Sequence, residues 1–232
     1  RTGYKYMINI LDKGTIDKIA AGEVVERPAS IVKELLENSI DAGSSSITVE
    51  IKNGGIDLIR ITDNGCGIDS KEVKTAFLRH ATSKIVSDKD LISIKSLGFR
   101  GEALSSIAAV SRCEIITKTR DELTGVRYYM EGGVEVEFEE IGAPDGTSII
   151  IRDIFYNTPA RRKFLKTAST EGAHISELVE KMAMSNTDIA FKFISNNQVK
   201  LQTNGNGNLK DIIYQLGAGD DGVYGSHGCM GE

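Results

Sequence analysis

Three polar side chains in the first fifth of the chain have the types and spacing of a catalytic and metal-binding site. Glu34, Asn38 and Asp41 stand at i, i+4 and i+7, so in a helix they share one stripe. A carboxylate one turn away from an amide can hold a water at Glu34 and a metal ion at Asn38. An ordinary amphipathic helix with solvated charges shows the same pattern, so other motifs must decide between the two interpretations.

A second motif, Asp63-x-Gly65-x-Gly67, follows an alternating apolar stretch. Counting by twos from Ile59 and Ile61 puts Asp63 at the end of a row of core residues, where a carboxylate needs a partner. It could accept a hydrogen bond from the amino group of a base while the two glycines let bare backbone approach the ligand. Because an aspartate could serve adenine or guanine, the residue type leaves the base open. Taken alone, the motif is more often a turn.

Two further segments could bind phosphate. Hydroxyl and ammonium groups gather at residues 82–84, and a glycine loop at residues 98–101 runs into the start of a helix, where backbone N–H groups favour phosphate oxygens. A flexible surface loop capped by a helix would look the same. The candidate residues are Thr82, Ser83, Lys84, Gly98, Phe99, Arg100, Gly101, Glu102, Ala103 and Leu104.

Thr147 is the last candidate. It follows Asp145-Gly146 at the start of an apolar strand, and its hydroxyl could support Asp63 or a bound water. An Asp-Gly-Thr turn leading into a strand is common, so this signal is weak by itself.

The sequence predicts helices and strands that would position these residues. Alternation on both sides of Asn53-Gly54-Gly55 predicts a β-hairpin, and spacings of three and four residues predict helices. Phe191, Phe193, Val199 and Leu201 are expected to continue the sheet, and the glycine-rich tail after Leu216 to be poorly ordered. The expected helices are 15–27 with a break at Gly22, 30–41, 70–80, 102–110, 160–167 and 171–186, and the other expected strands are 113–119, 125–130, 134–141 and 147–152.

Composition limits the class of protein. The 232 residues are 40% hydrophobic, enough for one large domain with a sizeable core. A net charge of −5 argues against a surface built to coat nucleic acid. The three cysteines lack the spacing of a zinc site or of a disulfide framework, and no apolar run approaches membrane-spanning length. We therefore expect a soluble, intracellular protein.

Six segments together resemble the MutL DNA mismatch-repair family, in its bacterial form. The resemblance runs from about Ile8 to about Leu216, which divides the chain into an arm at 1–7, an ATPase domain at 8–216 and a tail at 217–232. It implies an α+β two-layer sandwich, in which helices cover one face of a mixed, mainly antiparallel sheet, as in gyrase B, heat-shock chaperone ATPases and histidine kinases. The segments are 19–25, 34–43, 63–68, 80–84, 98–104 and 155–164.

The resemblance also implies roles for the candidates. Glu34 would polarise the attacking water, Asn38 would bind Mg²⁺, and Asp63 would receive the adenine amino group of ATP. Thr147 would support the base end, with Gly65 and Gly67 beside it. Residues 82–84 would belong to a lid over the nucleotide, and residues 98–104 would bind its phosphates.

The function implied is slow, Mg²⁺-dependent ATP hydrolysis that drives dimer closure in mismatch repair. The expected partners are a mismatch-recognition protein of the MutS type, a downstream nuclease or helicase, weakly bound DNA and a second copy of the chain, in the cytoplasm and at the nucleoid. A transducer domain and a C-terminal dimerisation region are expected to be missing from this chain. One alternative is a DNA-binding scaffold with a vestigial pocket, using the basic cluster Arg161, Arg162, Lys163 and Lys166. Another is a histidine kinase, which would need a phospho-accepting histidine that is not evident.

Overall fold

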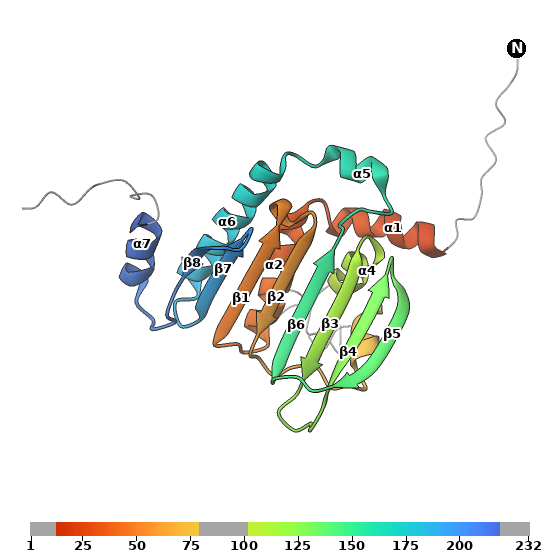
Figure 1. Ribbon diagram of the computed structural model, residues 1–232, viewed down its shortest axis with the longest axis horizontal. Helices are drawn as coiled ribbons and strands as arrows, with labels where there is room; N and C mark the ends of the chain where they lie inside the picture. The colour runs from red at the N-terminus through yellow and green to blue at the C-terminus, as the bar shows by residue number, and fades with distance from the viewer. Residues whose placement is uncertain (1–12, 79–101, 219–232) are drawn as a thin grey trace, which may run out of the picture.

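An eight-stranded sheet forms one layer of the molecule (Figure 1). The computed structural model describes residues 13–78 and 102–218. The strand order is β5-β4-β3-β6-β2-β1-β7-β8, and only β1 and β7 pair in parallel among the pairs described. The strands are β1 Ser46–Lys52, β2 Leu58–Asp63, β3 Arg112–Lys118, β4 Gly125–Glu131, β5 Val134–Ile141, β6 Gly146–Arg152, β7 Ala190–Ser195 and β8 Gln198–Gln202.

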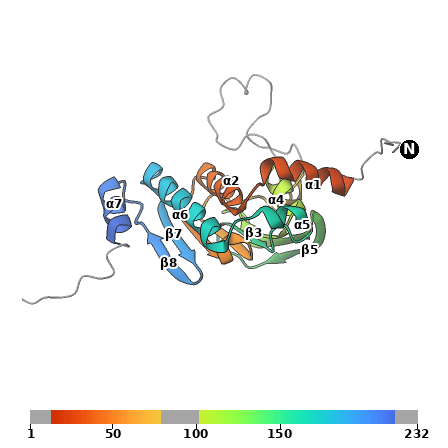
Figure 2. The same cartoon turned by 90° about the horizontal axis from the view of Figure 1, so that it is seen from above.

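Helices form the second layer, and Figure 2 shows α2, α4 and α6 on the same side of the sheet. Contacts of α2 with β2, of α4 with β3 and β4, and of α6 with β7 fix this arrangement. The α+β sandwich predicted from the sequence is therefore confirmed. The helices are α1 Lys13–Val24, α2 Pro28–Asp41, the 3-10 turn η1 Asn53–Gly55, α3 Val73–Ala76, α4 Ala103–Ala109, α5 Pro159–Phe164, α6 Ala168–Ser185 and α7 Leu209–Ala218.

The core lies between the two layers. Ile47, Val49 and Ile51 on β1 are fully buried, as their alternation predicts. They meet the apolar stripe of α2, of which Ile31 and Leu35 are at most 1% exposed. Each such side chain contributes about 1.5–3 kcal/mol by leaving water, so this packing fixes α2 against the sheet. Within residues 13–78 and 102–218, no helix has both the length and the apolar character needed to cross a bilayer.

Three helices differ from the sequence expectation. Helix α1 continues through Gly22, where the sequence predicted a break. A Cβ at this position would collide with the Arg161 guanidinium, so the glycine makes room for Arg161 and does not end the helix. Within the described part of 70–80, only Val73–Ala76 is α-helical. Helix α7 was not predicted from the sequence. In the structure, Asn208 accepts a hydrogen bond from Lys210 N at the start of α7, and Ile212 is buried. These two contacts stabilise α7.

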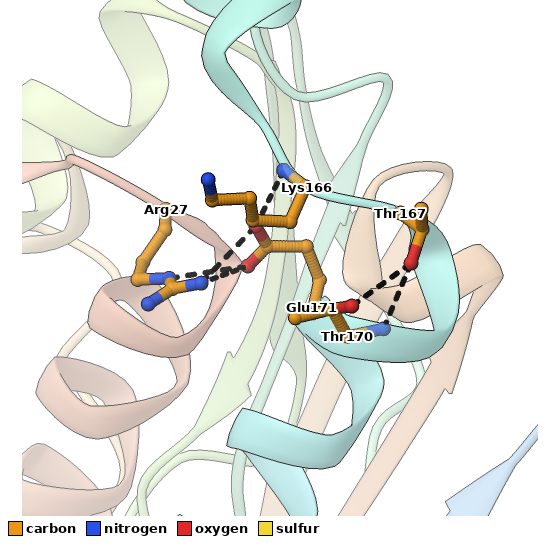
Figure 3. A network of polar contacts seen from close by, with 5 residues as sticks. All are labelled: Arg27, Lys166, Thr167, Thr170 and Glu171. Atoms are coloured by element: carbon orange, nitrogen blue, oxygen red, sulfur yellow. Dashed lines mark hydrogen bonds and ion pairs between the residues drawn. The ribbon is translucent and has the colours of Figure 1, made fainter.

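An ion pair between half-buried Arg27 and buried Glu171 joins the connection between α1 and α2 to the start of α6 (Figure 3). The carboxylate of Glu171, whose side chain is 1% exposed, accepts hydrogen bonds of 3.1 Å from Arg27 Nε and Nη2 and one of 2.9 Å from Lys166 N. Thr167 caps α6 by accepting from Thr170 N. Arg27 directly precedes Pro28, so this contact fixes where α2 begins.

Candidate active site

Asp63 is oriented by two hydrogen bonds at the end of β2. Its Oδ2 accepts from Ser39 Oγ at 2.9 Å, and its Oδ1 accepts from Gly65 N at 2.9 Å. Ser39 lies on α2 and is 4% exposed. Each carboxylate oxygen has a second lone pair, so Asp63 is fixed in direction and can still accept from a further donor. The sequence predicted that this carboxylate needs a hydrogen-bond partner, but it did not identify Ser39 as that partner.

Helix α2, which supplies Ser39, also carries three other predicted residues. Asn38 directly precedes Ser39, and Glu34 lies one turn before Asn38; both side chains are half-buried. Asp41 completes the stripe but is exposed. The Ser39–Asp63 hydrogen bond joins this helix to the end of β2. Convergence of Glu34 and Asn38 with Asp63 on one cavity stays a prediction.

Two threonines continue the site across the sheet. Thr147 on β6 is the register partner of Asp63 on β2 and of Thr117 on β3. The hydroxyls of Thr147 and Thr117 lie 3.0 Å apart, and Thr117 Oγ1 also accepts from Ile68 N at 2.9 Å. Thr117 is 1% exposed and was missed from the sequence, although it continues the inward-facing alternation of Cys113 and Ile115.

Gly65 and Gly67 are required by close packing within the protein. Gly67 has φ +73°, and a Cβ there would lie 2.2 Å from Lys118 O of β3. A Cβ on Gly65 would lie 2.7 Å from Ala42 Cβ and 2.8 Å from Ser44 Oγ. The loop after Asp63 thus packs directly on β3 and on the end of α2. Approach of a ligand to these glycines stays a prediction.

Most of the predicted phosphate-binding residues lie outside the described part of the chain. These are Thr82, Ser83, Lys84, Gly98, Phe99, Arg100 and Gly101. The rest of that segment, Glu102, Ala103 and Leu104, is half-buried at the start of α4, where Glu102 O accepts from Ser106 N. Because α4 packs against α1 and α2, the end of this segment lies near the helix that carries Glu34 and Asn38.

Within the part of the chain that the structure describes, no group of three or more His, Cys, Asp or Glu side chains could hold a metal ion. Cys66 and Cys113 are free thiols, and burial raises the pKa of Cys113 to about 12.

A hollow of about 520 Å³ lies between η1, α6 and the β7–β8 hairpin, and none of the predicted site residues lines it.

The fold and the family match together define the class of protein. The sequence profile of the histidine kinase-, DNA gyrase B- and HSP90-like ATPase family matches residues 26–142, half of the chain and the part that contains Glu34, Asn38 and Asp63. The chain belongs to this family.

Similar proteins identify the group within that family. The chain is 70% identical over 209 residues to the DNA mismatch repair protein MutL of Agathobacter rectalis, and 55% identical to MutL of Caldanaerobacter subterraneus. These matches cover 90% of this chain but only 32% and 35% of those proteins, so the chain spans about a third of their length. The Aquifex aeolicus MutL ATPase domain complexed with ADP is 31% identical, with a TM-score of 0.69 over 84% of this chain and 70% of that one. Within the family, this chain is a bacterial MutL N-terminal ATPase domain.

Proposed function

We propose that this chain binds ATP with Mg²⁺ and hydrolyses it slowly, as the nucleotide switch of a DNA mismatch repair protein. The observation that carries the proposal is the orientation of Asp63 by Ser39 and Gly65 beside the stripe of Glu34 and Asn38. The related domain of Aquifex aeolicus was solved in complex with ADP, which supports nucleotide binding by this chain.

Asp63 would select the base. The remaining lone pairs of its carboxylate would accept from the exocyclic amino group of adenine. Thr147, the register partner of Asp63 on β6, would support the same end of the base. Gly65 and Gly67 hold the loop that would border the base, with φ +73° at Gly67 fixing its direction.

Glu34 and Asn38 would carry the hydrolytic step. Mg²⁺ takes one or two protein oxygens together with phosphate oxygens and water, and the Asn38 amide oxygen is a donor of that kind. The ion, when bound, would offset charge on the phosphates. Glu34, one turn away, would orient the attacking water and accept its proton.

At the level of the whole protein, nucleotide binding would order the lid that includes residues 82–84, together with the N-terminal arm, and so close a dimer. The closed state would recruit a MutS-type recognition protein and a nuclease or helicase, with weak contact to DNA, in the cytoplasm and at the nucleoid. We expect slow turnover, and a monomer in the absence of nucleotide.

The test separates base recognition from hydrolysis. Asp63→Asn should abolish ADP binding in calorimetry, because its amide replaces one acceptor oxygen by a donor. Glu34→Ala should bind ADP normally but should stop hydrolysis in the full-length protein. Equal loss of affinity in both variants would contradict these roles.

The DNA-scaffold alternative is tested by titrating the same protein separately with duplex DNA and with ADP. Helix α5 exposes Arg162, Lys163 and Phe164, the last to 85%, a combination of basic and aromatic groups that suits nucleic acid. If this surface were the main function, duplex DNA would bind with a steep salt dependence while ADP gave no saturable signal.

A further inference from the structure

Four backbone N–H groups attach the loop that leaves β2 after Asp63 to its surroundings, and one of them is Cys66 N, which donates to Ala42 O at 3.0 Å. Gly65 N donates to Asp63 Oδ1, Ile68 N donates to Thr117 Oγ1 at 2.9 Å, and Ser70 N donates to Glu122 Oε1 at 3.0 Å. The Gly65 and Ile68 anchors are in the site already described. The Ser70 anchor comes from Glu122, in the turn between β3 and β4, which the sequence did not mark as functional.

Glu122 connects the loop to its own turn. While Oε1 holds Ser70, Oε2 accepts from Thr119 N at 3.2 Å and from Thr119 Oγ1 at 2.8 Å. Hydrogen bonds from Ser70 and Thr119 lower the pKa of Glu122 to about 2, so the carboxylate is ionised at neutral pH. Charge-assisted hydrogen bonds of this kind are stronger than neutral ones.

The turn itself is held from the other side by Lys118. Its Nζ donates to Glu122 O at 3.2 Å and to Thr119 O at 3.4 Å, and it pairs with Asp145. The backbone oxygen of the same Lys118 lies against Gly67. Glu122 therefore joins two stretches of backbone that touch each other at Gly67.

We propose that Glu122 is a positioning residue for nucleotide binding, acting through the Gly65–Ser70 loop. The proposal rests on the proposed function, because the loop borders the base that Asp63 would recognise. With Ser70 released, the segment after Gly67 loses one of its two attachments to the sheet, and the loop samples orientations that do not fit the base. Binding a nucleotide then requires this segment to be ordered again, which weakens affinity.

The experiment compares Glu122→Gln with wild type by calorimetry with ADP, together with thermal unfolding and amide hydrogen exchange. The glutamine keeps the shape but removes the charge and one acceptor oxygen. We expect the Kd for ADP to rise about five- to tenfold. Exchange should become faster at Ile68 and Ser70 and stay unchanged in β1 and α6. Thr119→Val, which removes a donor at the other end of Glu122, should give a smaller increase in Kd.

Glu177→Gln on α6 is the matched control, because it removes the same charge from an exposed carboxylate paired with Lys181. Its Kd should equal that of wild type. An unchanged Kd in Glu122→Gln, with or without a lower Tm, would overturn the proposal, and so would faster exchange throughout the sheet. Absence of ADP binding by wild type would instead overturn the proposed function.

Discussion

Ser39 Oγ lies 2.9 Å from Asp63 Oδ2, and this contact joins the central helix to the end of the sheet. Both groups are at the junction of the two layers, since Ser39 is buried on α2 and Asp63 ends β2. The direction of the Asp63 carboxylate is therefore set by a residue from the same helix as Glu34 and Asn38. Four predictions follow from this and related contacts.

Ser39→Ala should weaken ADP binding about tenfold, which corresponds to the roughly 1.4 kcal/mol expected for one hydrogen bond to a charged group. The alanine leaves Asp63 held by Gly65 N alone. Calorimetry measures the change. Ser111→Ala is the control, because Ser111 is also buried and donates to Ile107 O at 2.7 Å at the end of α4. Equal affinity of Ser39→Ala and wild type for ADP would show that the Ser39 hydrogen bond to Asp63 does not contribute to nucleotide binding.

Gly67→Ala should destabilise the fold more than Gly43→Ala does. Both glycines have positive φ, +73° and +71°, so each alanine meets a backbone penalty of about 1–2 kcal/mol. Only at Gly67 does the new Cβ also meet Lys118 O, at 2.2 Å, whereas nothing lies within 4 Å of the Cβ position at Gly43. We expect this overlap to lower the free energy of unfolding of Gly67→Ala by about a further 1–3 kcal/mol. Urea unfolding of the two variants measures the difference, and equal losses would contradict the close approach.

Arg27→Met should lower the free energy of unfolding by about 1.5–3 kcal/mol, since the Glu171 carboxylate loses its charged donor while the apolar stem is kept. Glu171 is almost fully buried, so water cannot replace that donor easily. Lys181→Met removes an exposed i,i+4 partner of Glu177 and should cost only about 0.3–0.5 kcal/mol. Denaturant unfolding distinguishes the two, and a loss at Arg27 as small as that at Lys181 would contradict a structural role for the pair.

Glu122 should make stability depend on pH in the acid range. Hydrogen bonds from Ser70 and Thr119 lower its pKa from 4.5 to about 2, so the folded state favours the ionised carboxylate more than the unfolded state does. Its contribution is fully present above about pH 4.5 and is lost as the pH falls towards 2. Between these values, the free energy of unfolding of wild type should fall more steeply than that of Glu122→Gln. Parallel curves from urea unfolding at pH 7, 4.5 and 3 would contradict the assignment.

Local patterns predicted most of the secondary structure. Alternation around Asn53-Gly54-Gly55 predicted the β1–β2 hairpin, and Pro28 with the apolar spacing that follows it predicted α2. These signals succeed because a strand repeats every two residues and a helix every 3.6. Helix α7 and the continuity of α1 were not predicted: Ile212 of α7 becomes buried only in the folded chain, and Gly22 accommodates Arg161 from a segment distant in sequence.

The sequence by itself determined which side chains could do the chemistry, because residue type and helical spacing place Glu34 and Asn38 one turn apart wherever the helix packs. Only the tertiary structure decided what holds Asp63 and the loop that follows it, because Ser39, Thr117 and Glu122 lie 24 to 59 positions away from Asp63 along the chain. Hydrogen bonds across such separations depend on strand register and on the seating of a helix against the sheet. No local pattern in a single sequence specifies either.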